Sequence, residues 1–253
     1  MTYPSGLIRD EAAAVAQQFG VALDQVQRDH LISSILATLQ THTDELIFFG
    51  GTALARTYLM DGRLSEDIDL IAVADRRPTA RAITRTIDRA LRVTRGRVNW
   101  TADLADIRDT EPASLLTTDG LIVRIQLLRA QGYPSWPTAV HDIYQRYSDI
   151  APTRLRTPTR DSFAASKTAA WFERRAPRDL YDLWALTVAG GLTSSAAQLF
   201  ATHTGVGLPQ DHMFRTAPTV QDWHEQLSGQ TRLAVGPEEA LEVVRAAWSA
   251  ARS

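Results

Sequence analysis

Two aspartates separated by one apolar residue are the side chains of this sequence best suited to metal chemistry. Asp67 and Asp69 flank Ile68 within a run that continues into Leu70 and Ile71. Alternate side chains of a β-strand share a face, so the two carboxylates would lie about 7 Å apart on one side. A cation between them would relieve their repulsion, and hard oxygen ligands of this kind suit Mg²⁺ with a phosphate substrate. The neutral alternative is a solvated strand face.

A glycine pair precedes this acidic run. The apolar segment 46–49 predicts a strand, Gly50 and Gly51 follow it, and a short helix comes next. A glycine turn before a helix permits close backbone approach and offers free N–H groups at the positive end of the helix dipole. Such a pair is often only a tight turn, but its order and spacing relative to the acidic pair favour a phosphate site.

One lysine stands out among the basic residues. The chain has 27 basic residues, of which only Lys167 is a lysine. Lysine presents a compact point charge whereas arginine presents a broad planar fork, so a tight phosphate site can distinguish them. The alternative is that Lys167 survives by chance in an arginine-biased protein.

A second pair of aspartates follows Lys167 at the start of another predicted helix. Asp179 occupies a position where a carboxylate stabilises a helix N-terminus, and Asp182 lies three residues further on the same face. The neutral reading makes Asp179 a helix cap and Asp182 a partner of a nearby arginine.

Composition indicates an ordinary soluble, cytoplasmic protein. The 253 residues are 44% hydrophobic and 22% charged, with a net charge of −2 and no cysteine. We expect no transmembrane helix and no signal peptide. The six histidines are scattered and no Gly-x-Ser-x-Gly motif occurs, so neither serine hydrolysis nor a histidine metal site is indicated.

The pattern of apolar residues predicts an α/β (α+β) fold in two parts. Strands are expected at 46–49, from 67 to about 74, at 98–104 and at 121–128, with a weaker strand signal near 154–155. Helices are expected at 7–18, 22–41, 79–92, 160–175, 179–189, 193–203, 219–228 and 237–251. We therefore predict a core with amino-terminal helices over residues 1–157 and a helical domain over residues 158–253.

A row of arginines marks the predicted helix 79–92. Arg77, Arg81, Arg85, Arg89 and Arg92 recur at spacings that place them along one stripe. Such a stripe could follow a phosphate backbone, or it could be a solvated face in an arginine-rich protein.

The combined motifs resemble those of a known family. Gly-Gly-Thr-Ala-Leu from Gly50, Ser-Glu-Asp-Ile-Asp-Leu from Ser65, a helix with Lys167, and Arg-Asp-Leu-Tyr-Asp-Leu from Arg178 are similar to the AbiEii/AbiGii nucleotidyltransferase toxins, the group that includes the MenT toxins. The resemblance covers residues 49–186. It implies a polymerase-beta-like nucleotidyltransferase core with a mixed sheet, a helical second domain, a cleft between them and a cognate antitoxin.

The resemblance also implies roles for residues. Gly50, Gly51, Thr52 and Ser65 would contact the phosphates of an NTP, and Asp67 and Asp69 would hold Mg²⁺. Lys167 would place its charge on the triphosphate. Asp179 or Asp182 would either orient Lys167 or accept a proton, and the sequence does not separate these roles. Arg178, with Arg77, Arg81 and Arg85 of the stripe, would bind RNA.

The implied activity is transfer of nucleotides, preferentially pyrimidines, to the 3′ end of tRNA, which blocks translation. Three alternatives stay open: nucleotidyl transfer to a protein or small molecule, phosphoryl transfer or modification of Ser65 itself, and a non-catalytic module that binds nucleotide or antitoxin. Many members of the wider superfamily carry a third carboxylate on a later strand, where this chain offers Arg124 and Gln126. A strict two-metal mechanism is therefore in doubt.

Overall fold

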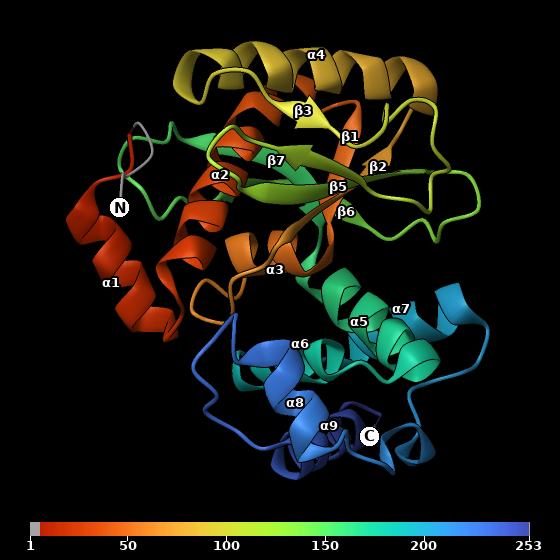
Figure 1. Cartoon of the computed structure of the whole chain (residues 1–253). Helices are drawn as coiled ribbons and strands as arrows, with labels where there is room; N and C mark the ends of the chain where they lie inside the picture. The colour runs from red at the N-terminus through yellow and green to blue at the C-terminus, as the bar shows by residue number, and fades with distance from the viewer. Residues whose placement is uncertain (1–5, 253) are drawn as a thin grey trace.

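The computed structural model of the chain describes residues 6–252. A sheet with its surrounding helices forms one part of the molecule, and a group of helices forms the other (Figure 1). The sheet has the strand order β1-β2-β5-β4-β3. Strands β2 and β5 are parallel and the remaining pairs are antiparallel, which confirms the predicted mixed sheet. Its strands are β1 (Leu46–Phe49), β2 (Asp67–Ala72), β3 (Asn99–Trp100), β4 (Ala113–Leu116) and β5 (Ile122–Arg129).

The helices follow the predicted order, and a separate hairpin joins the two parts. The hairpin pairs β6 (Thr138–Ile143) with β7 (Thr153–Pro158). In the sheet half the helices are α1 (Arg9–Phe19), α2 (Leu23–Leu39), the short η1 (Gln40–His42), α3 (Gly50–Thr57) and α4 (Arg76–Thr94). In the helical half they are α5 (Arg160–Arg174), α6 (Pro177–Val188), α7 (Ser194–Thr204), the short η2 (Asp211–Phe214), α8 (Val220–Leu227) and α9 (Pro237–Ala251).

The two faces of the sheet differ in burial. Along β2, Ile68 and Leu70 are buried whereas Asp67 and Asp69 are partly accessible. Strand β5 alternates in the same way, with Val123, Ile125 and Leu127 buried. Helices α2 and α4 contact β5, and α4 lies above the sheet with α5 to α9 below it in Figure 1. One face is thus a covered apolar layer, while the other turns its polar residues toward the helical half.

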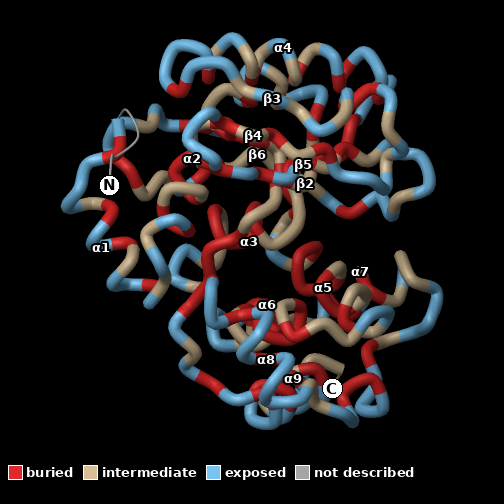
Figure 2. Tube along the Cα trace, viewed as in Figure 1, coloured by how far each residue is buried: buried red, intermediate tan, exposed pale blue. Residues whose placement is uncertain are grey.

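One continuous apolar core runs through both halves. Buried side chains form a single cluster that extends from Leu31 in α2, through the sheet, to Trp248 in α9, and Figure 2 shows buried segments in both halves. A smaller cluster around Phe19, Val26 and Tyr147 packs α1 against α2. The halves are therefore parts of one packed body.

One predicted strand is shorter than expected, and two strands were not predicted. Only Asn99–Trp100 pairs as a strand in the predicted segment 98–104, because the chain then turns at Asp103, which accepts a hydrogen bond from the backbone N–H of Ala105 at 2.8 Å. Strands β4 and β6 were not predicted. The division at residue 157 stays a prediction, although β7 ends at Pro158.

Candidate active site

A cavity lies between the sheet and the helical half, and its floor is the polar face of the sheet. Phe49 of β1, Asp69 of β2 and Gln126 of β5 lie side by side in register. Ile47, Ile71 and Leu128 form the next row, and both rows line the cavity. Since a register shift of one residue would turn this face into the apolar core, the strand pairing places Asp69 at the cavity.

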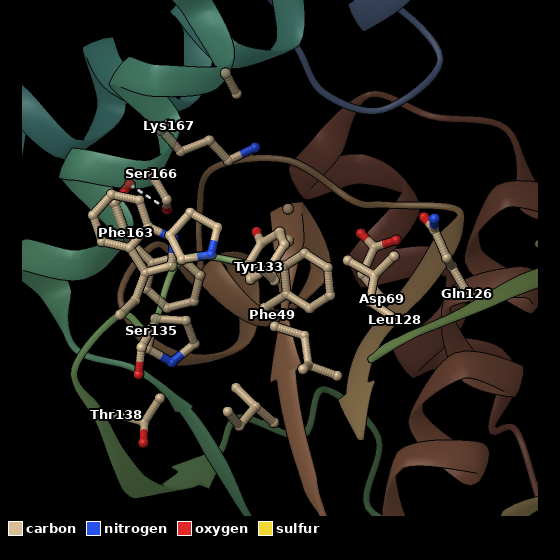
Figure 3. Close-up of a pocket in the computed structure, with 18 of the residues that line it drawn as sticks. Phe49, Asp69, Gln126, Leu128, Tyr133, Ser135, Thr138, Phe163, Ser166 and Lys167 are labelled. Atoms are coloured by element: carbon tan, nitrogen blue, oxygen red, sulfur yellow. Dashed lines mark hydrogen bonds between the residues drawn. The ribbon is translucent and has the colours of Figure 1, made fainter. Parts of the chain in front are cut away.

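The roof of the cavity is one stripe of helix α5. Phe163, Ser166, Lys167, Ala170 and Arg174 line it at helical spacing. The cavity has a volume of about 380 Å³, within the range of small-molecule sites. Figure 3 shows Lys167 on the helix on one side and Asp69 on the strand on the other, both at the same space.

Aromatic rings form part of the wall. Tyr133 and Trp136, from the segment between β5 and β6, line the cavity together with Phe49. The rings of Phe49 and Tyr133 lie 5.4 Å apart. Burial raises the pKa of Tyr133 to about 12, with a further contribution from Asp69, so its hydroxyl stays protonated at neutral pH.

Gly50 is required by the close approach of Asp69. Its φ of 78° lies in the left-handed region, and a Cβ at this position would lie 2.1 Å from Oδ2 of Asp69. Burial raises the pKa of Asp69 to about 6, and repulsion from Asp67 adds to this effect. Attraction by Lys167, Arg174 and Arg124 lowers the pKa but does not outweigh the first two causes. The Asp69 carboxylate is thus held where its negative charge lacks full compensation.

Asp67 has a partner that the sequence analysis missed. Arg124 lies opposite Asp67 in the β2–β5 register. Its Nε donates to Oδ1 of Asp67 at 2.7 Å and its Nη2 donates to Oδ2 at 3.0 Å. The pair lies at the open edge of the site, with 49% of the Arg124 side chain and 31% of the Asp67 side chain exposed. The two aspartates share a sheet face as predicted, but only Asp69 lines the cavity.

The two hydroxyl residues expected at the phosphates do not line the cavity. Thr52 donates from Oγ1 to the backbone carbonyl of Asp67. Ser65 accepts at Oγ from Nη1 of Arg63 at 3.1 Å. Both are buried, whereas Gly50 and Gly51 line the cavity at the start of α3. A role of Thr52 and Ser65 at a nucleotide stays a prediction.

Lys167 lies at the centre of a buried ion network. Its Nζ is 2.6 Å from Oδ2 of Asp182 and 3.2 Å from Oδ1 of Asp179. Arg174 binds Asp179 through both oxygens, at 2.6 and 2.9 Å. Arg63 binds Asp182 in the same bidentate way, at 2.8 and 3.0 Å. The structure therefore brings together the three predicted residues, Lys167, Asp179 and Asp182, and adds two arginines.

The network fixes the ionisation of both aspartates. Burial alone would raise the pKa of Asp179, but Lys167 and Arg174 lower it to about 2. Burial likewise opposes ionisation of Asp182, and Arg63 and Lys167 outweigh it, so its pKa lies below the usual value. Carboxylates with low pKa values are weak bases near neutral pH. This favours the orienting role over proton acceptance, the two roles that the sequence left open.

The donor set suits a divalent cation held partly by its substrate. Two carboxylates lie on one sheet face, and the partly uncompensated charge of Asp69 faces the cavity. Within residues 6–252 no group of three or more Asp, Glu, His or Cys side chains gathers as a metal site. Magnesium is commonly bound by one or two carboxylates plus substrate phosphates, so these residues fit Mg²⁺ in that mode.

The arginines expected to bind RNA lie away from the cavity. Arg77 pairs with Asp106 at 2.7 Å, and Arg81 and Arg85 are exposed on α4, beyond the covered face of the sheet (Figure 1). Arg178 is half-buried at the start of α6 and does not line the cavity. Contact of these arginines with RNA stays a prediction.

Comparison with known structures defines the class of fold. The chain is similar to the nucleotidyltransferase toxin MenT4 of Mycobacterium tuberculosis H37Rv, with a TM-score of 0.70 and 18% identity over 96% of this chain and 89% of that one. It is also similar to a crystal structure described as a candidate nucleotidyltransferase from H. pylori, with a TM-score of 0.55 and 16% identity over 91% of this chain and 95% of that one. The fold is that of a nucleotidyltransferase.

The sequence then gives the family. Residues 34–252 match the family described as nucleotidyl transferase AbiEii toxin, type IV toxin–antitoxin system, and the chain belongs to this family. No curated protein matches the chain. Membership identifies a toxin enzyme of the nucleotidyltransferase class, with a nucleotide substrate and an antitoxin partner, and such enzymes generally use divalent metals. Among the described residues, no helix is long and apolar enough to cross a membrane.

Proposed function

We propose that this toxin transfers a nucleotidyl group from an NTP, preferentially a pyrimidine nucleotide, to the 3′-hydroxyl of tRNA. The observation that carries the proposal is the meeting of Asp69 and Lys167 at one cavity, the acid on the sheet and the ammonium group on α5. One wall is suited to a cation and the other to a phosphate. A triphosphate with its bound cation presents both partners at once.

The reaction joins the 3′-oxygen of RNA to the α-phosphorus of the NTP. The bond from the α-phosphorus to the oxygen that bridges it to the β-phosphorus breaks, pyrophosphate leaves, and the hydroxyl loses its proton to water. Mg²⁺ held by Asp67, Asp69 and the triphosphate would neutralise the charge that develops on the phosphates.

The helical wall would bind the triphosphate. The Lys167 ammonium has three N–H donors and two carboxylate partners, which leaves one donor for a phosphate oxygen. Arg174 lines the same wall, and 63% of its side chain is exposed. Asp179 and Asp182 would keep Lys167 oriented rather than accept the hydroxyl proton.

The aromatic wall offers a surface for a base. Phe49, Tyr133 and Trp136 contribute aromatic rings, which have apolar faces, to the lining of the cavity. A nucleobase stacks on such faces regardless of its identity, with a gain of about 1–3 kcal/mol. This supports a nucleotide as the ligand of the cavity and leaves base choice to neighbouring polar groups such as Ser135 and Thr138.

Two radiolabels test the proposal. The protein is incubated with Mg²⁺ and each NTP in turn, labelled at either the α- or the γ-phosphate, with tRNA, protein and aminoglycoside offered separately. The proposal expects α-label on the 3′ end of tRNA, strongest with CTP or UTP, and no transfer with Asp69→Asn. Transfer of γ-label would show phosphoryl transfer, and α-label on protein or drug would show a different acceptor; either result alone contradicts the proposal.

A further inference from the structure

The pairing of Arg124 with Asp67 places a fixed cation at one end of the acidic pair. Both oxygens of Asp67 accept from the guanidinium, at 2.7 and 3.0 Å. Asp69, two residues along the strand, has no such partner among residues 6–252: there its charge meets Lys167, Arg174 and Arg124 through longer-range attraction. The two aspartates are therefore unequal, and a divalent cation that uses Asp67 must share it with Arg124 or displace Arg124.

Strand register accounts for this arrangement. Arg124 is the β5 residue opposite Asp67, and Gln126 is the β5 residue opposite Asp69. Both extend from the sheet face that carries the two aspartates. The neighbours of the two aspartates on β5 are therefore a cation, Arg124, and a neutral amide, Gln126. Neither is a carboxylate, so neither strengthens binding of a metal ion without nucleotide. Repulsion between a guanidinium and a divalent cation further weakens metal binding without a nucleotide.

We propose that Arg124 is a positioning residue that makes metal uptake depend on the nucleotide. In the protein without nucleotide, Arg124 pairs with Asp67 and disfavours binding of a divalent cation. An incoming triphosphate supplies four negative charges, so it attracts both the metal and the guanidinium, and Arg124 turns from Asp67 to a phosphate oxygen. This inference rests on the proposed function, because it assumes that an NTP occupies the site.

The geometry permits this exchange. Half of the Arg124 side chain is exposed, so its guanidinium can move without unpacking the core. An exposed ion pair contributes little to stability, and a triphosphate oxygen is a stronger partner for a guanidinium than a partly solvated carboxylate. The neighbouring buried residues Val123 and Ile125 hold the strand in place while the side chain turns.

Binding of Mn²⁺ to the protein without nucleotide tests the inference. Free Mn²⁺ is measured by electron paramagnetic resonance for the wild type, Arg124→Gln, Arg124→Lys and the control Arg129→Gln. Arg129 is an exposed residue of the same strand that pairs with Asp109 instead, at 3.0 Å, so its variant loses the same charge away from the acidic pair. We expect Arg124→Gln to bind Mn²⁺ about tenfold more tightly than wild type, Arg124→Lys to lie between, and Arg129→Gln to match wild type.

A second titration adds an NTP with a methylene group between its α- and β-phosphates, which cannot transfer its nucleotide. This ligand should tighten Mn²⁺ binding of the wild type by a larger factor than that of Arg124→Gln, because only the wild type has the competing pair to release. Equal Mn²⁺ affinities of wild type and Arg124→Gln without nucleotide would overturn the inference even if the enzyme transfers label. Tighter Mn²⁺ binding by Arg124→Gln in a protein that transfers no label would uphold the effect of Arg124 on Asp67 and contradict the proposed function instead.

Discussion

The two walls of the cavity differ in how their clustered carboxylates are compensated by cations. On the sheet, Asp67 and Asp69 have one close cation, Arg124, and this group is half-exposed. On the helices, Asp179 and Asp182 have three close cations, Arg63, Lys167 and Arg174, and the network is largely buried. On the sheet two carboxylates thus have one close cation, whereas in the ion network of the helical wall two carboxylates have three.

The difference separates charges that hold the structure together from charges that are available to bind a ligand. In the buried network every carboxylate oxygen is engaged, and each aspartate has a bidentate arginine in addition to Lys167. On the sheet the uncompensated charge of Asp69 faces the cavity. A metal ion bound to a triphosphate would supply a positive charge to the sheet wall and negative charges to the helical wall. The following variants test whether the two walls differ in this way.

The largest expected effect comes from Lys167. Lys167→Ala removes the cation shared by Asp179 and Asp182, while each aspartate keeps its arginine, so we expect a loss of stability of about 1–3 kcal/mol. We expect transfer activity to fall by about 10³-fold and the urea midpoint to fall as well. Lys167→Arg would test the need for a point charge. Wild-type stability of Lys167→Ala would contradict the view that this wall is a closed ion network.

Asp69→Asn should separate activity from stability on the sheet wall. The pKa of Asp69 is raised from 3.8 to about 6 in the folded protein, so the folded state binds more protons than the unfolded state between these pH values. The free energy of unfolding should therefore fall as pH rises through this window. Without metal at neutral pH, Asp69→Asn should be more stable than wild type by on the order of 2 kcal/mol, yet inactive.

Urea unfolding of both proteins at several pH values, with a chelator present, measures this effect. The stability difference should shrink toward zero below the ordinary pKa of an aspartate, because Asp69 is then neutral in both states. A difference that stays constant with pH would show that the carboxylate is not held in an unfavourable charge environment.

Gly50→Ala tests the contact between the glycine turn and Asp69. The added Cβ would meet Oδ2 of Asp69 at 2.1 Å and would also require a left-handed φ. We expect a loss of about 1–3 kcal/mol and at least a tenfold loss of transfer. Gly120→Ala is the matched control, since Gly120 has a φ of 89° with nothing within 4 Å of its Cβ position. Its backbone cost should be similar, with activity retained; equal loss of activity in both would refute the role of the contact.

The smallest effect is expected from the α4 arginines. Arg81 and Arg85 are exposed and lie far from the cavity walls, so the double change to Gln should leave transfer to a short RNA unchanged. If they follow tRNA phosphates, affinity for full-length tRNA should fall a few-fold and its salt dependence should weaken by about one phosphate contact per arginine. Unaltered salt dependence would make the stripe a solvated face.

Local signals predicted the elements that carry the site. The strand–glycine–helix–strand unit from Leu46 to Ala72 and the apolar strand β5 were readable because their patterns and turn residues agree with their tertiary setting. Strand β6 could not be predicted in this way, because it contains the polar residues His141 and Asp142 and forms a strand through its pairing with β7. Its short segment has too weak a pattern of its own.

The ion-pair partners of the predicted site residues were harder to predict from the sequence. Arg63 reaches Asp182 across 119 positions and Arg124 reaches Asp67 across 57, and nothing local distinguishes these arginines from the others in an arginine-rich chain. A usable signal existed for Arg124 alone: a charged residue inside an otherwise apolar strand requires a partner on its face. Identifying that partner needs the β2–β5 register, which only the fold provides.

The segment from Gly62 to Ser65 limits how the chain can be divided for experiment. Leu64 donates its backbone N–H to the carbonyl of Gln230 at 2.9 Å, and Thr231 donates from its hydroxyl to the carbonyl of Gly62 at 2.8 Å. A fragment that stopped at residue 157 would lose these acceptors and donors and leave Arg63 without its carboxylate. Such a fragment should be insoluble when expressed alone, and recovery would require supplying the remaining residues as a separate polypeptide.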